Sequence, residues 1–232
     1  GCLKVTPAHD AHDYEIGLRH NLPVMDIIDD HGRLNEKARI LVGEDRFDAR
    51  KKIVKMLEES GNLVKVEEYT SPVGYSERTN AVIEPKLSAQ WFLKMEDLAA
   101  KALESVESGK IKLIPDKYRN TYRHWMENAH DWCISRQLWW GHQIPAWYCD
   151  DCGHINVSRE DPTKCEKCGC KHLTREEDVL DTWFSSQLWT FATQGWPQKP
   201  EELEGHHPTT ALVTARDIIA LWVARMIMSS LY

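Results

Sequence analysis

The 232-residue sequence has no long apolar run and no surplus of positive charge. No window reaches the 18 consecutive apolar residues that a membrane-spanning helix needs. The first residues, Gly-Cys-Leu-Lys-Val-Thr, lack the charged and then apolar layout of a secretory signal. The formal net charge of -7 disfavours a surface that binds phosphate backbones everywhere, so contact with nucleic acid is expected to be local. These absences favour a globular, cytoplasmic protein with no membrane contact.

The sequence is nevertheless rich in apolar and aromatic residues. Its hydrophobic content of 42% can build the core of one large domain or of two small ones. Ten tryptophans are present, and such large aromatic side chains form both cores and ligand pockets.

Seven cysteines include two Cys-x-x-Cys pairs, Cys149 with Cys152 and Cys165 with Cys168. An odd total, with four of the cysteines in such pairs, favours metal ligation in a reducing compartment over disulfides. The spacing is typical of tetrahedral zinc held on two knuckles, and four protein ligands would close the site and make it structural. Reduced cysteines without metal are the alternative, and Cys170 or His154 could replace one ligand.

Residues 1–85 are expected to be β-rich with few helices. The spacing of apolar residues and the turn residues between them predict strands at 2–6, 63–69 and 81–83. Helices are predicted at 10–20 and at 43–60, where Gly61 would end the second one.

Within this region, the ten residues from Lys4 to Asp13 hold a cation, a hydroxyl, two imidazoles and two carboxylates. The residues alone predict the end of a strand followed by a helix cap, because Asp10 and Asp13 both suit a first helical turn.

Residues 86–130 are expected to connect two larger parts. A helix is predicted from Glu96 to Ser108. Trp91 and Phe92 could face a ligand, but burial is favoured for these residue types. The segment 118–128 mixes basic and aromatic residues, which suits either RNA contact or a solvated amphipathic helix.

The last hundred residues carry two strand-like segments that end in polar groups. Residues 178–186 and 211–217 are each predicted to begin as a buried parallel strand, and a buried helix should span 218–231. Ligands gather at the carboxyl edge of doubly wound sheets, so the polar groups there are candidates for a binding site. Asp217 and Arg225 disfavour a membrane span for the last helix.

Four motifs resemble valyl-tRNA synthetases and their isoleucyl and leucyl relatives. The run Trp-Cys-Ile-Ser-Arg-Gln-Leu-Trp-Trp-Gly-His-x-Ile-Pro-Ala-Trp resembles the point where the chain re-enters the catalytic domain after the editing domain. Lys-Val-Thr-Pro-Ala-His-Asp-x-x-Asp is similar to a segment that lines the editing pocket. Asp-Val-Leu-Asp-Thr-Trp-Phe-Ser-Ser and Val-Thr-x-x-Asp-Ile-Ile-x-x-Trp-Val-Ala-Arg-Met resemble the second half of the catalytic domain.

The resemblance implies roles for individual residues. Asp10 would hold the α-amino group of a wrongly attached amino acid, and the pocket that recognises a threonine hydroxyl would be lined by Lys4, Thr6 and Asp13. The family's threonine-rich segment that completes this pocket does not occur in this sequence, so only half of the editing site is expected.

The same resemblance implies a valine site and a nucleotide site. The valine side chain would be enclosed by Trp183, Ile218 and Trp222. ATP would meet Thr214, Ala215 and Asp217, with Asp217 on the ribose. Ala215 stands where the family usually has glycine, which the close backbone approach to the nucleotide would require.

The expected fold is α/β. It comprises part of a β-rich, barrel-like editing domain at 1–85, a helical connector at 86–130, and part of a Rossmann-type catalytic domain at 131–232 with a zinc ribbon inserted at 149–170.

The expected parent is a monomeric ligase that attaches valine to tRNA(Val) with ATP and magnesium and hydrolyses threonyl-tRNA. The family's His-x-Gly-His and Lys-Met-Ser-Lys-Ser motifs do not occur here, so this internal fragment is not expected to ligate by itself. The alternatives are a zinc-ribbon RNA-binding module and a fragment of an isoleucyl enzyme.

Overall fold

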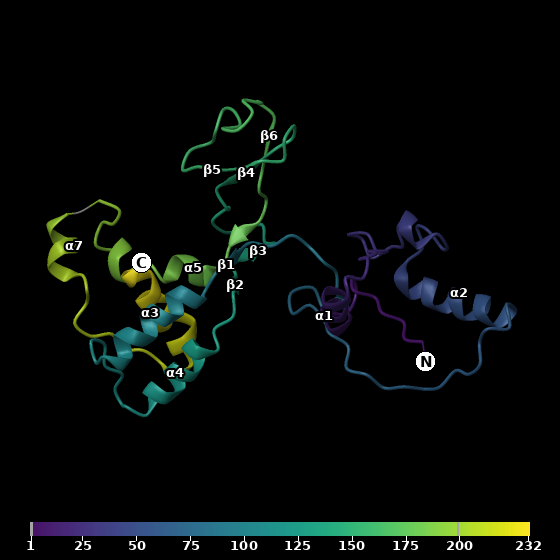
Figure 1. Ribbon diagram of the computed structural model, residues 1–232, viewed down its shortest axis with the longest axis horizontal. Helices are drawn as coiled ribbons and strands as arrows, with labels where there is room; N and C mark the ends of the chain where they lie inside the picture. The colour runs from purple at the N-terminus through teal and green to yellow at the C-terminus, as the bar shows by residue number, and fades with distance from the viewer. Residues whose placement is uncertain (1, 199) are drawn as a thin grey trace. The chain divides into compact units, whose positions relative to one another are not determined.

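The computed structural model describes residues 2–198 and 200–232. The chain divides into two compact units, Gly1–Ala89 and Gln90–Tyr232. Figure 1 shows that the first unit is mostly irregular chain around two helices, whereas the second holds most of the helices and all the labelled strands. Within the described residues, no helix is both long and apolar enough to cross a membrane.

The first unit contains three helical segments, each begun by a polar side chain. They are α1 (Ala11–His20), the short 3-10 helix η1 (Glu36–Ala38) and α2 (Arg46–Glu59). The Oδ1 atom of Asp10 accepts the backbone N–H groups of His12 and Asp13 at 2.9 and 3.0 Å, which satisfies donors that the first turn leaves unpaired. The helices predicted at 10–20 and 43–60 are therefore confirmed, as is the cap.

The strands predicted in the first unit are largely wrong. Residues 2–6 and 63–69 have no regular structure, and from the 81–83 segment only Val82 pairs, in a single bridge with Tyr75. A strand is stable only when a neighbour satisfies its backbone groups, and within the described residues 2–89 no strand partner pairs with 2–6 or 63–69. Their apolar side chains lie in the open, with Val64 99% exposed.

The second unit is organised around a helical core. Its main helices are α3 (Glu96–Glu107), α4 (Tyr118–Glu127), the π-helical turn η3 (Ile219–Val223) and α8 (Ala224–Leu231). Ala102 of α3 and Ala224 of α8 are fully buried, and such small side chains let these packed helices approach closely. The helix predicted at 96–108 is confirmed, and the one at 218–231 is confirmed from Ile219 onward. Of the two alternatives for 118–128, the amphipathic helix is the one that forms, as α4. The buried cluster contains Met95, Ala99, Ala102, Val106, Tyr122, Met126, Trp132, Ile219, Ala224, Ile227 and Met228.

Short helices connect these elements. They are α5 (Thr182–Ser186), α6 (Trp189–Ala192), α7 (Glu201–His206) and the 3-10 helix η2 (Arg216–Ile218).

Three small antiparallel sheets complete the unit. Strand β1 (Phe92–Leu93) pairs with β2 (Trp132–Cys133), and β3 (Ser135–Arg136) pairs with β7 (Val179–Leu180). A ribbon is formed by β4 (Ala146–Cys149) between β5 (Ile155–Val157) and β6 (Leu173–Arg175), with Trp147 opposite both Asn156 and Arg175. Figure 1 shows these three strands side by side.

The two strands predicted as parallel in the second unit have different outcomes. Residues 179–180 do form a strand, β7, but it pairs antiparallel with β3, and residues 211–215 form none. The first stops at Leu180, because Asp181 caps α5 by accepting the backbone N–H of Trp183 at 3.2 Å. The second segment, 211–215, is irregular, and Val213 is 96% exposed. A parallel strand is buried between neighbours and covering helices, and no described residue pairs with this segment.

The contact between α3 and α4 predicts a measurable pH dependence. Glu107 accepts hydrogen bonds from Arg123 and Arg119, at 2.7 and 2.6 Å, and these lower its pKa from 4.5 to about 2. Because the pKa is lower in the folded chain than in the unfolded chain, the ionised carboxylate stabilises the fold at pH values above the unfolded-state pKa. This contribution is lost as the pH falls from about 4.5 towards 2. Glu107→Gln should therefore flatten the fall in unfolding midpoint across that window.

The measurement is thermal unfolding at stepped pH, with Glu104→Gln on the same helix as the matched control. Curves for Glu107→Gln and the unchanged chain that run parallel between pH 4.5 and 2 would contradict this account of Glu107.

Candidate functional site

The four cysteines of the predicted zinc ribbon come together in space. The thiol sulfurs of Cys149, Cys152, Cys165 and Cys168 all lie within 4.8 Å of one another. Cys149 lies 3.5 Å from Cys168 and Cys152 lies 3.8 Å from Cys165, measured between sulfurs. Zinc–sulfur bonds of about 2.3 Å in a tetrahedron place sulfurs about 3.8 Å apart. The cluster therefore has the size of a tetrathiolate metal site.

Two tight turns present these thiols. The backbone N–H of Gly153 donates to the carbonyl of Cys149, and that of Gly169 donates to the carbonyl of Cys165, each at 2.9 Å. Both glycines have positive φ, +65° and +77°, which a side chain at either position would disfavour. The Cys-x-x-Cys-Gly sequence thus forms the same knuckle twice.

Backbone N–H groups stabilise the thiolate form of the two buried cysteines. The N–H of Cys152 lowers the pKa of Cys149. Burial raises the pKa of Cys165, but the N–H groups of Cys168 and Lys167 outweigh it and lower the value to about 6. The backbone N–H of Cys170 lowers the pKa of Cys168, but hydrogen bonds with the thiols of Cys152 and Cys149 outweigh it and raise the value. The backbone thus favours the metal-binding thiolate form at Cys149 and Cys165.

A polar contact anchors this ribbon to the start of the unit. Glu176 accepts hydrogen bonds from the indole N–H of Trp91, at 2.9 Å, and from the hydroxyl of Tyr148. Trp91 is half-buried, whereas Phe92 is 59% exposed. The expected burial of this aromatic pair is therefore wrong for Phe92.

Three of the four predicted editing residues form one hydrogen-bonded chain. The ammonium of Lys4 donates to the hydroxyl of Thr6 at 3.2 Å, and that hydroxyl donates to Oδ2 of Asp13 at 3.1 Å. The backbone N–H of Thr6 also donates to Asp13, at 2.7 Å, and lowers its pKa. Asp10 begins the helix that carries Asp13, so all four groups meet at the start of α1.

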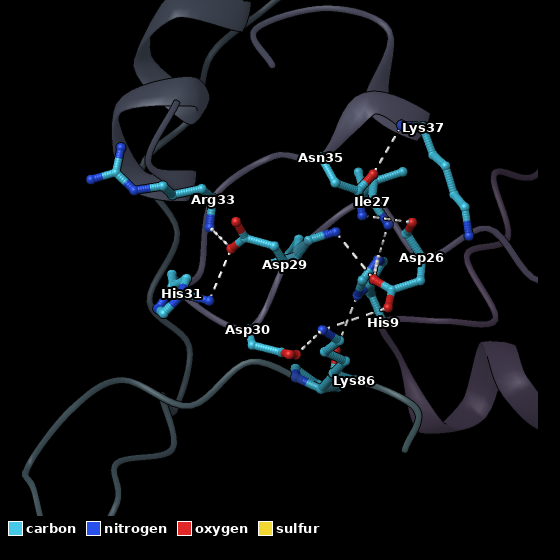
Figure 2. Close-up of polar contacts among 12 residues, drawn as sticks. His9, Asp26, Ile27, Asp29, Asp30, His31, Arg33, Asn35, Lys37 and Lys86 are labelled. Carbon is cyan, nitrogen blue, oxygen red and sulfur yellow. Dashed lines mark hydrogen bonds and ion pairs between the residues drawn. The ribbon is translucent and has the colours of Figure 1, made fainter. Parts of the chain in front are cut away.

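His9 fixes this motif to two distant segments of the first unit. Its Nδ1 lies 3.1 Å from the carbonyl of Pro85, and its Nε2 lies 3.1 Å from the backbone N of Ile27. One neutral tautomer satisfies both contacts, with Nδ1 donating and Nε2 accepting. Figure 2 shows His9 between Ile27, Asp26 and Lys86. The sequence motif contained this histidine, but nothing in the sequence indicated its partners.

Lys86 adds an ionic contact beside His9. Its ammonium lies 2.6 Å from Asp30 and 3.8 Å from Asp26, and its hydrogen bond lowers the pKa of Asp30 (Figure 2). These contacts hold the segment around Lys86, which follows the bridge at Val82, against the loop at residues 26–30.

The predicted valine-pocket residues lie on neighbouring elements. The indole N–H of Trp222 donates to the carbonyl of Ser186 at 2.9 Å, and the turn η3 that carries Trp222 packs on α5, which carries Trp183. Ile218 ends η2, directly before η3. All three side chains are half-buried, so each retains surface for a ligand.

The predicted ATP residues lie on the irregular segment before that helix. Thr214 is half-buried, and Ala215 and Asp217 are exposed. Asp217 pairs with its neighbour Arg216 at 3.2 Å. These residues remain together in sequence, but no described strand positions them.

Asp181 is an organising residue that sequence reasoning missed. Its Oδ2 accepts the indole N–H of Trp132 at 3.1 Å and a guanidinium N–H of Arg136 at 2.6 Å. The two donors are distant in sequence and carried no local signal.

One cavity lies in the second unit beside Trp132. It has a volume of about 630 Å³ and an apolar lining that includes Trp132, Phe184 and Phe191. None of the residues predicted to bind valine, ATP or metal lines it. The chemistry of the site therefore follows from the residue contacts above rather than from the cavity.

Comparison with known proteins gives consistent matches along the chain. The profile of the family tRNA synthetases class I (I, L, M and V) matches residues 12–232. Valine–tRNA ligase of Thermotoga maritima is 58% identical over 228 residues, which cover 98% of this chain and 26% of that protein. The enzyme of the same name from Symbiobacterium thermophilum is 54% identical over 231 residues, which cover 100% of this chain and 25% of that protein. The chain thus spans about a quarter of the length of these relatives.

A solved ternary complex of Agrobacterium radiobacter K84 LeuRS with tRNA and LeuAMS covers 82% of this chain and 18% of its own, at 16% identity and a TM-score of 0.24. That score is too low to support a structural argument. The family profile, in contrast, spans both units and includes the cysteine ribbon and the helices of the second core. The chain belongs to the class I tRNA synthetases of the I, L, M and V group.

Proposed function

We propose that this chain is part of a valine–tRNA ligase, in which it supplies half of an editing pocket, a structural zinc ribbon and part of the amino-acid site. The observation that carries the proposal is 58% identity to a valine–tRNA ligase over 98% of the chain. The longer enzyme would activate valine with ATP and magnesium and transfer it to tRNA(Val). A monomeric state and a cytoplasmic location stay predictions.

An editing pocket is chemically necessary in such an enzyme. Threonine has nearly the shape of valine, so a pocket built for valine rejects it poorly, and this enzyme is itself the standard example of that limit. A second site that recognises the threonine hydroxyl removes the error by hydrolysis. The chain of hydrogen bonds from Lys4 through Thr6 to Asp13 supplies polar groups for such recognition.

Asp10 suits the role of ammonium partner. Both of its cap hydrogen bonds go to Oδ1, so Oδ2 can accept from the α-ammonium group of a misattached amino acid. The carboxylate would then position the ester for attack by water, while the contacts of His9 keep the start of α1 in place.

The valine site would be built between α5 and η3. The indole of Trp222, fixed by Ser186, and the side chains of Trp183 and Ile218 would enclose a branched aliphatic group. Bulky walls exclude isoleucine by steric overlap, which is an easier task than excluding a smaller side chain. Asp217 would contact the ribose of the adenylate from the adjoining segment.

The finer architecture is also a proposal. In a longer enzyme, residues 63–69 would join a β-barrel-like editing domain and residues 211–215 a parallel Rossmann sheet. The exposure of Val64, Tyr69 and Val213, at 99%, 89% and 96%, supports this, because such side chains bury readily against further strands. Residues 1–85, 86–130 and 131–232 would then belong to the editing domain, a connector and the catalytic domain.

The metal of the four-cysteine cluster is proposed to be zinc. Four thiolates at tetrahedral spacing match its structural sites, and a closed site supplies folding energy rather than catalysis.

The alternative functions are less well supported. An RNA-binding module would need a basic face, which the net charge of -7 does not favour. The two arginines of α4, Arg119 and Arg123, both pair with Glu107. An isoleucyl enzyme is disfavoured because relatives at 52–58% identity carry the name of the valine enzyme.

The zinc assignment predicts tight metal binding. The chain loaded with one equivalent of zinc should retain about one ion per molecule through gel filtration, because the four soft ligands are preassembled. Cys165→Ser should release it, whereas Cys2→Ser, which changes a cysteine of the other unit, should not. Metal analysis that finds no zinc in the folded, reduced chain would refute the assignment.

The editing assignment predicts a selective loss in the full-length ligase that contains this chain. Asp10→Asn keeps a good helix cap but removes the charge that meets the substrate ammonium. A charged hydrogen bond is worth about 1.5–3 kcal/mol, so kcat/KM for deacylation of threonyl-tRNA should fall roughly 10- to 150-fold. Valine-dependent ATP–pyrophosphate exchange should be unchanged and should exceed exchange with isoleucine.

Asp45→Asn is the matched control, because Asp45 caps α2 in the same way by accepting the backbone N–H of Phe47 at 2.9 Å. An equal fall in valine activation and in deacylation would show that Asp10 is only structural. Faster exchange with isoleucine than with valine would favour the isoleucyl alternative.

A further inference from the structure

A second group of metal-ligating side chains lies on the same ribbon, outside the four-cysteine cluster. The ligand atoms of Asp151, Cys170 and His172 all lie within 4.8 Å of one another. None of these three residues belongs to the two Cys-x-x-Cys pairs.

Backbone pairing of the ribbon brings the first and last of these residues together. Asp151 lies in the first knuckle, between Cys149 and Cys152. Its neighbour Asp150 donates its backbone N–H to the carbonyl of His172 at 3.2 Å, just beyond the pair in which β4 Cys149 faces β6 Leu173. The carboxylate and the imidazole are thus placed by the antiparallel pairing rather than by flexible chain.

The second knuckle places the thiol. The carbonyl of Cys170 accepts the backbone N–H of Cys165 at 2.7 Å, which fixes residue 170 at the end of the turn. The sulfur of Cys170 accepts the backbone N–H of His172 at 3.2 Å. That contact holds the thiol beside the backbone of His172.

We propose that Asp151, Cys170 and His172 form a second site for a divalent metal of the zinc class. Carboxylate oxygen, thiolate sulfur and imidazole nitrogen are the three ligand types that zinc uses in proteins. Three protein ligands leave a fourth position to water, so this site binds more weakly than the four-cysteine cluster. A zinc ion with four thiolates carries net negative charge, which favours a second cation nearby.

The test is equilibrium dialysis of the 232-residue chain against increasing zinc, followed by metal analysis. The unchanged chain should bind about one zinc tightly and approach about two at saturation. Asp151→Asn, Cys170→Ser and His172→Ala should each weaken the second site by at least the roughly 10- to 100-fold that loss of even an outer-shell partner typically costs. The tightly bound ion should remain in all three variants.

Lys171→Ala is the matched control, since it changes an exposed residue of the same turn that offers no ligand in this cluster, and it should still bind about two zinc ions. Saturation of the unchanged chain at one zinc would overturn the proposal. So would loss of the tightly bound ion in Cys170→Ser, because Cys170 would then be a ligand of the four-cysteine cluster.

Discussion

The buried carboxylate of Asp181 holds the second unit together at the point where its candidate ligand residues lie. It joins β2 through Trp132, β3 through Arg136 and the start of α5 through the backbone of Trp183. The guanidinium of Arg225, on α8, lies 3.7 Å from the centre of the Trp132 ring, which places a second cation near the same carboxylate. Burial lowers the pKa of Arg225, and Asp181 opposes that effect. Of the elements that would enclose valine, α5 is thus tied through Asp181 to β2 and β3.

The first unit is held together differently. Among its described residues the buried side chains are few and small, such as Ala8 and Ala49. Hydrogen bonds and ion pairs between distant segments therefore take the place of a hydrophobic core. His9 joins three segments of chain, and Arg46 bonds both Glu84 and the carbonyl of Val82. Apolar burial is the main driving force of folding, so a unit with so little of it gains stability from additional packing partners. This is consistent with a chain that spans a quarter of its relatives.

Local sequence signals predicted the helices and the cysteine cluster but failed for the strands. Asp10 and the paired cysteines act through near neighbours in sequence, so their effects could be deduced from spacing. The strands at 63–69 and 211–215 were wrong because a strand depends on partners that spacing does not reveal. The contacts of Asp181 were missed for the same reason, since Trp132 lies far away in sequence. The editing residues and the valine residues were both named from the family resemblance. The four editing residues lie within ten positions, whereas the valine residues come together only through the packing of η3 on α5.

The central claim is that the charge of Asp181 organises the second unit, and equilibrium unfolding of Asp181→Asn tests it most directly. The substitution keeps the size of the side chain but leaves Arg136 without its partner, so the free energy of unfolding should fall by about 1.5–3 kcal/mol. Asp178→Asn is the matched control on the same strand segment, because burial raises the pKa of Asp178 and its loss of charge should cost nothing. Equal unfolding free energies for the two variants would contradict the account.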